Sequence, residues 1–169
     1  PSATSTFTPT PTPAPPTQPQ QTSFNAEDGQ VLDGSYHPPQ TCSPLLTIVY
    51  FPWVRGDQND WPELASLLPP DADYSTLSIT ARGCQGGCGQ EWDRAGWLLD
   101  YTAALTTASQ LPCANQNQLV TIGSSVGADG AIYACGQAPT CVGALAFSPN
   151  GWLDVPYTDE VARMVEQGK

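Results

Sequence analysis

The residues whose types and spacing could do chemistry are Gly123-Ser124-Ser125-Val126-Gly127, a Gly-x-Ser-x-Gly motif. Where a strand turns sharply into a helix, the central serine is held in a strained backbone conformation and its hydroxyl can act as a nucleophile. Bulky neighbours would collide with the strand and the helix, and Gly123 and Gly127 remove those side chains. The serine also lies at the helix N-terminus, where free N–H groups favour developing negative charge.

The sequence around the motif predicts the strand and the helix that such a turn requires. Leu119 to Ile122 is an apolar, β-branched run, which is typical of a buried strand. Ala128 to Ala134 is rich in small residues and predicts a helix. We therefore interpret Ser125 as a nucleophile. A glycine-rich turn without a catalytic role is the alternative, because the motif alone is common by chance.

The other elements alternate between strands and helices, which predicts an α/β fold with a mostly parallel sheet and helices on both faces. A β-hairpin comes first, with Thr22 to Ala26 and Gln30 to Tyr36 as strands and Glu27-Asp28-Gly29 as the turn. The further predicted strands are Leu45 to Phe51, Tyr74 to Thr80 and Val142 to Ser148. The further predicted helices are one that begins at Asp60 as N-cap and ends before Pro69, one over Glu91 to about Ser109, and one from Asp159 to Glu166.

The start of the chain differs in composition from the rest. Pro1 to about Gln21 contains Pro, Thr, Ser, Gln and Ala with almost no large apolar side chain, which predicts an extended, solvated tether. Such a tether commonly follows a lipid-anchored cysteine, here upstream of Pro1, but a generic disordered linker explains it equally well. We predict two parts, a tether at residues 1–21 and a folded domain at residues 22–169.

Charge and cysteine content indicate which classes of partner are excluded and which cellular compartment is expected. The chain has 16 Asp and Glu against 5 Lys and Arg, which argues against nucleic acid or an anionic membrane surface as a partner. Its six cysteines favour disulfides over free thiols, so we expect an extracytoplasmic protein, secreted or tethered to the cell envelope. No apolar run is long enough to span a bilayer. The cysteine spacing does not suit zinc, and we expect neither a metal nor a cofactor.

In order and spacing, these segments resemble the α/β-hydrolase superfamily, particularly its dienelactone-hydrolase-like and esterase-like members, from roughly Thr22 to the C-terminus. The motif at 123–127 is the most specific part of the resemblance. The supporting segments are the hairpin around Asp28, Leu45 to Asp57 with Trp61, Thr80-Ala81-Arg82-Gly83, and Ala144 to Pro149. The resemblance implies a serine hydrolase that transfers an acyl group from an ester, thioester or amide to water, with a carboxylic ester as the expected substrate.

By the same resemblance, two backbone N–H groups would hold the oxyanion: that of Val126, and one from the loop after the third strand, at Trp53 or Val54. Where the family usually has His-Gly, this chain has Pro52-Trp53, and proline has no N–H to donate. This departure and the Pro/Thr-rich tether also suit an alternative function, a non-catalytic extracytoplasmic binding module on a hydrolase fold. We expect the other tryptophans to pack in the core or between helices: Trp61, Trp92, Trp97 and Trp152.

The resemblance also implies that the catalytic acid and histidine follow the nucleophile, after the last two strands. The one histidine, His37, precedes it, at the end of the hairpin and far from the serine in the family topology. Helix-dipole or capping roles explain Asp129, Asp154 and Asp159. A serine without an adjacent base is a poor nucleophile. We therefore expect the acid and the base beyond Lys169, and little or no hydrolysis from this chain alone.

The family topology further implies how the cysteines pair, although the sequence alone leaves many pairings open. The strands that begin near Leu45 and Leu119 are parallel neighbours in the family, so the cysteines just before them would lie side by side. The other four cysteines bracket two short turns. The expected pairs are Cys42 with Cys113, Cys84 with Cys88, and Cys135 with Cys141.

Overall fold

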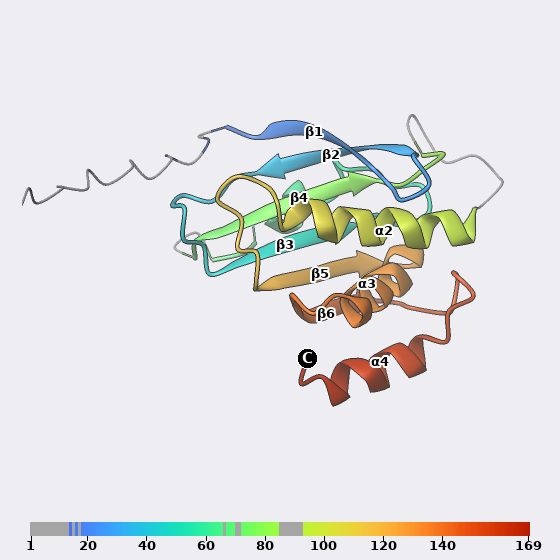
Figure 1. Ribbon diagram of the computed structural model, residues 1–169. Coiled ribbons are helices and arrows are strands. Elements are labelled where there is room, and N and C mark those ends of the chain that lie inside the picture. Colours follow the sequence, from blue (N-terminus) through green and yellow to red (C-terminus); the bar gives the residue numbers. More distant parts are fainter. Residues whose placement is uncertain (1–13, 15, 17, 66, 70–71, 85–92) are drawn as a thin grey trace, which may run out of the picture.

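The computed structural model describes residues 14, 16, 18–65, 67–69, 72–84 and 93–169. These residues form a six-stranded sheet with helices against it (Figure 1). The strands are β1 Gln20–Asn25, β2 Val31–His37, β3 Leu46–Phe51, β4 Tyr74–Thr80, β5 Leu119–Ser124 and β6 Cys141–Phe147. The helices are α1 Pro62–Ala65, α2 Arg94–Ala108, α3 Val126–Gln137 and α4 Tyr157–Glu166. The predicted α/β fold class is confirmed.

The sheet brings together the ends of strands that are distant in the sequence. Its order is β1-β2-β4-β3-β5-β6. The strands β3 to β6 are parallel, whereas β1 and β2 form an antiparallel hairpin that pairs with β4. The carboxyl ends of parallel strands meet at one edge of a sheet, where ligands of such folds bind. Phe51 at the end of β3 pairs with Gly123, so the loop after β3 lies beside the Gly-x-Ser-x-Gly motif.

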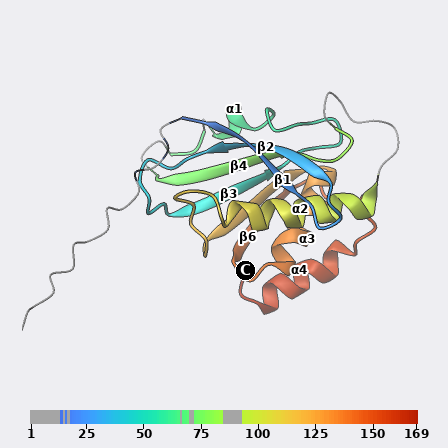
Figure 2. The ribbon, with the colours of Figure 1, turned by 45° about the horizontal axis from the view of Figure 1, so that its top comes forward.

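Each face of the sheet carries its own hydrophobic core, because successive side chains of a strand point to opposite faces. Val49 and Phe51 pack against residues of α2 and α3, whereas Ile48 and Tyr50 pack against Trp61 on the other face. Figure 2 shows α1 on one side of the sheet and α2, α3 and α4 on the other. The helix on the less covered side has four residues. The apolar side chains that stay exposed on the edge strand β6 are Val142, Leu145 and Phe147.

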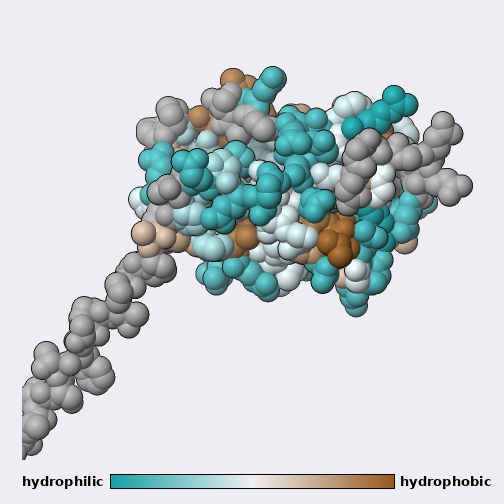
Figure 3. Space-filling view, turned by 90° about the horizontal axis from the view of Figure 1, so that it is seen from above, coloured by the Kyte–Doolittle hydropathy of each residue, from teal (hydrophilic) through white to brown (hydrophobic). Residues whose placement is uncertain are grey.

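The surface on the side where β1 lies is mainly hydrophilic, with hydrophobic residues in small separate groups (Figure 3). This agrees with a chain whose formal net charge is −11 at neutral pH. No helix in the described part of the chain is long and apolar enough to cross a bilayer.

The first helix differs most from its prediction. Its predicted course runs from an Asp60 cap to the residue before Pro69, but α1 comprises only Pro62–Ala65. Asp60 Oδ2 accepts hydrogen bonds from the Trp53 indole Nε1 and the Asp57 backbone N–H, both at 2.9 Å. The carboxylate therefore closes the loop before the helix.

The chain before the hairpin is described only in part. β1 begins at Gln20, inside the segment predicted as a tether. Residues 1–13, 15 and 17 lie outside the described residues, and the tether therefore stays a prediction.

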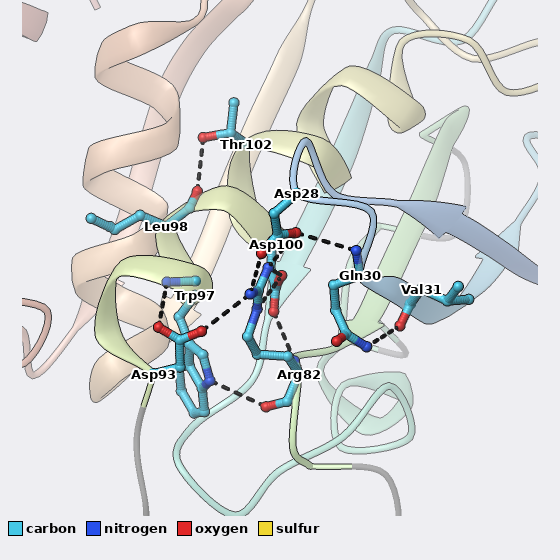
Figure 4. A network of polar contacts seen from close by, with 10 residues as sticks. Asp28, Gln30, Val31, Arg82, Asp93, Trp97, Leu98, Asp100 and Thr102 are labelled. Atoms are coloured by element: carbon cyan, nitrogen blue, oxygen red, sulfur yellow. Dashed lines mark hydrogen bonds and ion pairs between the residues drawn. The ribbon is translucent and has the colours of Figure 1, made fainter.

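Arg82, in the loop after β4, joins the hairpin turn to α2 (Figure 4). Its guanidinium contacts Asp28 of the turn at 2.5 Å, Asp93 at the N-cap of α2 at 3.1 Å, and the buried Asp100 at 2.7 Å. The hydrogen bond from Arg82 lowers the pKa of Asp28, whereas burial raises the pKa of Asp100 against the opposing effect of Arg82. A buried carboxylate requires such a partner. The network therefore fixes the loop after β4 against the hairpin and α2.

The described structure confirms two of the predicted disulfides. Cys42–Cys113 joins the segments that precede β3 and β5, with the Cα atoms 4.3 Å apart. Cys135–Cys141 joins the end of α3 to the start of β6, with the Cα atoms 5.1 Å apart. The third predicted pair includes Cys88, which lies outside the described residues.

Candidate active site

Ser125 occupies a strained corner between β5 and α3. Its backbone has φ 55° and ψ −122°, whereas β5 ends at Ser124 and α3 begins at Val126. A non-glycine residue with positive φ is uncommon, and such strain persists where the surrounding structure imposes it. The Ser125 side chain is partly exposed. The chain therefore contains the sharp strand-to-helix turn that the motif predicts.

Both glycines of the motif stand where a side chain would strike backbone. A Cβ added to Gly123 would lie 2.0 Å from the carbonyl oxygen of Gly127. A Cβ added to Gly127 would lie 2.4 Å from the Pro52 oxygen and 2.5 Å from the Phe51 oxygen. The glycines thus allow α3 to begin directly against the end of β3. This close packing places the loop after β3 beside Ser125.

The three backbone N–H groups that the resemblance assigned to an oxyanion site lie at this same edge of the sheet. Val126 is the first residue of α3, and its N–H therefore has no acceptor within the helix. Trp53 and Val54 follow β3 directly, and neither N–H donates a hydrogen bond in the described part of the chain. The Ser125 N–H is used differently: it donates to the Phe147 oxygen at 2.9 Å and ties the turn to β6.

The loop after β3 is closed on itself. Besides the two hydrogen bonds to Asp60 Oδ2, the Gly56 N–H donates to the Trp53 oxygen at 2.9 Å. A Cβ on Gly56 would lie 2.1 Å from Asp60 Oδ2, so the ring of Trp53, the carboxylate and the glycine form one packed unit. Sequence reasoning missed this role of Asp60, because a carboxylate just before a helix is also the usual N-cap.

A cavity of about 730 Å³ opens beside the corner. Its volume is within the range of small-molecule sites. Its lining residues are Trp53, Asp60, Trp61, Glu63, Leu64, Leu67, Ser124 and Phe147. Ser125 is not among them, but the residue before it and the residue that accepts its N–H are. The cavity therefore lies next to the serine rather than around it.

The positions of the tryptophans in the cavity lining and in the core differ in part from the prediction. Trp53 lines the cavity and is 43% exposed. Trp61 is buried but also lines the cavity, and Trp97 is buried in the core of the α2 face. Trp152 is 38% exposed and therefore lies outside the core. Trp92 lies outside the described residues.

Asp129, in the first turn of α3, has a larger role than its predicted interaction with the helix dipole. Its side chain is buried, with 1% exposed. The carboxylate accepts hydrogen bonds from the backbone N–H groups of four successive residues, 150–153. It therefore anchors the loop after β6 to the helix that follows Ser125. No local pattern marks this role, because the donors lie more than twenty residues further along the chain.

The described residues bring no base to Ser125. His37 pairs with Thr76 near the amino end of β4, and hence lies at the opposite edge of the sheet from Ser125. Asp154 forms an ion pair with Arg94 at 2.6 Å and does not cap α4, whose N-cap residue is Pro156. Asp159 lies in the first turn of α4. Within the described residues, no group of three His, Cys, Asp or Glu side chains could hold a metal ion.

These features together define the α/β-hydrolase fold: a largely parallel sheet led by an antiparallel hairpin, with a strained serine between a central strand and its helix. No protein-family model and no curated protein sequence matches the chain. Several solved structures do match the chain in fold.

An esterase of Pyrococcus furiosus superposes with a TM-score of 0.65 and 19% identity, over 81% of this chain and 54% of that one. A dienelactone-hydrolase-like promiscuous phosphotriesterase from metagenomic libraries superposes with a TM-score of 0.62 and 17% identity, over 81% of this chain and 60% of that one. An acetyl xylan esterase of Thermoanaerobacterium superposes with a TM-score of 0.59 and 14% identity, over 76% of this chain and 47% of that one. The chain thus spans about half the length of these solved structures.

Proposed function

We propose that this chain carries the nucleophile of an α/β-hydrolase-type serine hydrolase that transfers an acyl group from a carboxylic ester to water. The strained backbone of Ser125, at the tip of a sharp turn from strand to helix, carries the proposal. Two further features support it. Backbone contacts leave no room for a side chain at either glycine of the motif, and a cavity lies beside the corner. Esterases with the same fold also support the ester as substrate.

In the proposed reaction, the Ser125 hydroxyl loses its proton to a base and attacks the ester carbonyl carbon. The base passes this proton to the alcohol as it leaves, and then activates a water molecule that hydrolyses the acyl-enzyme, releases the acid and returns the serine. The N–H of Val126 and that of Trp53 or Val54 would donate to the oxyanion in both steps. Such donors are fixed before the reaction starts, and the loss of one costs about 3 kcal/mol of transition-state stabilisation.

The base and the acid are proposed to come from chain beyond Lys169. The one histidine lies at the wrong edge of the sheet, and the chain spans 54% of the Pyrococcus esterase. Residues 1–169 would then hold a serine that no base activates. We expect little or no ester hydrolysis from them alone.

A fluorophosphonate probe tests the proposal, since it labels only an activated serine. The protein is made with the sequence encoded after Lys169, and in parallel as residues 1–169. We expect labelling of Ser125 in the longer protein, none in its Ser125→Ala variant, and none in residues 1–169. Ser124→Ala in the longer protein is the matched control, and it should still be labelled at Ser125. An extended protein that folds but stays unlabelled would overturn the proposal and favour the non-catalytic binding module.

A further inference from the structure

The cavity beside Ser125 has a chemical bias that the proposed reaction does not by itself require. Most of its lining is apolar: Trp53, Trp61, Leu64, Leu67 and Phe147. The charged side chains in the lining are Asp60 and Glu63. Among the described residues, no lysine, arginine or histidine lines it. An apolar site with negative charge and no cation discriminates between substrates by their charge.

The aromatic walls of the cavity are fixed before any ligand binds. Trp61 stacks on Tyr50 of β3, with ring centroids 5.2 Å apart and an angle of 16° between the planes. The hydrogen bond from Trp53 Nε1 to Asp60 Oδ2 holds the second indole ring. A ligand therefore orders few side chains on binding, which reduces the entropic cost of association. The volume of about 730 Å³ accommodates an aromatic ring together with a short alkyl chain.

The negative charge at the cavity is also fixed. Asp60 Oδ2 accepts two hydrogen bonds, from Trp53 Nε1 and from the Asp57 N–H, so this carboxylate cannot turn away from the loop. Arg55, the cation nearest in sequence, is exposed and does not line the cavity. An anionic group in the cavity would meet the like charge of Asp60 and Glu63, and no described cation in the lining compensates it.

Resting on the function proposed above, we infer that this cavity selects substrates whose acyl or alcohol group is neutral and apolar, and rejects those that place a carboxylate there. Asp60 is the specificity-determining residue, and it acts through its charge rather than through its shape.

Two anilides of equal length test the inference, because they bind without being consumed. Butyranilide ends in a methyl group where succinanilic acid ends in a carboxylate. Their affinities for residues 1–169 carrying Ser125→Ala are measured by titration calorimetry at neutral pH. We expect butyranilide to bind about tenfold more tightly at low salt, and we expect this preference to shrink at about 1 M NaCl because salt screens the repulsion.

Asp60→Asn separates charge from geometry. Both hydrogen bonds of Asp60 end on the same oxygen, and one amide oxygen can accept both. The variant should bind succinanilic acid about threefold to tenfold more tightly and leave butyranilide unchanged. Asp57→Asn removes the same charge from the same loop outside the cavity lining and should change neither affinity. Phe147→Ser should weaken butyranilide, since it removes part of the apolar wall.

Equal affinities for the two anilides, no measurable binding of either, or an equal effect of Asp57→Asn and Asp60→Asn would overturn the inference. These outcomes are independent of catalysis, because the measurement uses a protein without the serine hydroxyl. Failure of the proposed function would instead leave Ser125 unlabelled in the extended protein while the anilide preference persisted.

Discussion

Gly127 shows how a single missing side chain shapes the candidate site. A Cβ there would lie 2.4 Å from the Pro52 oxygen and 2.5 Å from the Phe51 oxygen, and neither backbone atom can move without shifting β3. Gly123 meets the same limit from the carbonyl of Gly127. Close contact between backbones thus imposes the corner at Ser125. Gly123 and Gly127 permit this contact because they have no side chain, and so they position the Ser125 hydroxyl.

Gly127→Ala is expected to destabilise the protein by about 2–3 kcal/mol, because overpacking of a backbone contact forces the strand or the helix to shift. The free energy of unfolding in urea measures the loss. Gly143→Ala in β6 is the matched control: no atom lies within 4 Å of its added Cβ, and its effect should stay within about 0.5 kcal/mol. Equal stability of the two variants would contradict the close contact.

At the scale of elements, the first turn of α3 organises the site. Its first turn follows Ser125, and Asp129 in that turn holds the loop after β6 through four backbone N–H groups. The Ser125 N–H donates to the Phe147 oxygen of β6 as well. These hydrogen bonds therefore tie the helix, the corner and the neighbouring strand together and hold the serine beside the cavity.

Asp129→Ala is expected to cost about 3 kcal/mol of unfolding free energy, because it removes a buried carboxylate that accepts from four backbone N–H groups, one of them that of the buried Leu153. Hydrogen exchange of the amides of residues 150–153 should accelerate in the variant. Asp159→Ala, at an exposed acid in the first turn of α4, serves as control and should change stability by less than about 0.5 kcal/mol. Unchanged protection of these four amides would show that the loop is held by other contacts.

At the scale of the whole molecule, the two described disulfides tie the sheet at the edge away from the site. Cys42–Cys113 spans 71 residues of sequence and links the segments before β3 and β5. Cys135–Cys141 spans six residues and closes the turn between α3 and β6. Both pairs lie where the parallel strands β3, β5 and β6 begin, whereas Ser125 lies where β5 ends. The disulfides and the candidate site thus lie at opposite edges of the sheet.

Because the longer loop restricts the unfolded chain more, replacing Cys42 and Cys113 together by alanine should cost about 4 kcal/mol, against about 2 kcal/mol for Cys135 and Cys141. Urea unfolding of the two double variants and of the parent protein measures both losses. A larger loss from the shorter loop would show that native-state packing, rather than chain entropy, dominates.

Much of the fold follows from local patterns in the sequence. The β-branched run before Gly123, the Asp28-Gly29 turn and the alternation of strands with helices predict the sheet, and the structure bears them out. The pairing of Cys42 with Cys113 came from the family topology, and the described structure confirms it. The first helix was predicted too long, and the Asp60 carboxylate, predicted as its N-cap, accepts hydrogen bonds from the preceding loop.

By itself, the sequence predicted the sharp turn from strand to helix at Ser125, since glycine spacing and the flanking periodicities are local properties of the chain. The tertiary structure alone decided what surrounds that corner. Asp129 meets donors more than twenty residues away, Asp60 turns toward Trp53, and Trp61 lines the cavity as well as the core. These contacts depend on which strand ends meet at one edge of the sheet, and strand order is set by packing between distant segments rather than by any one of them.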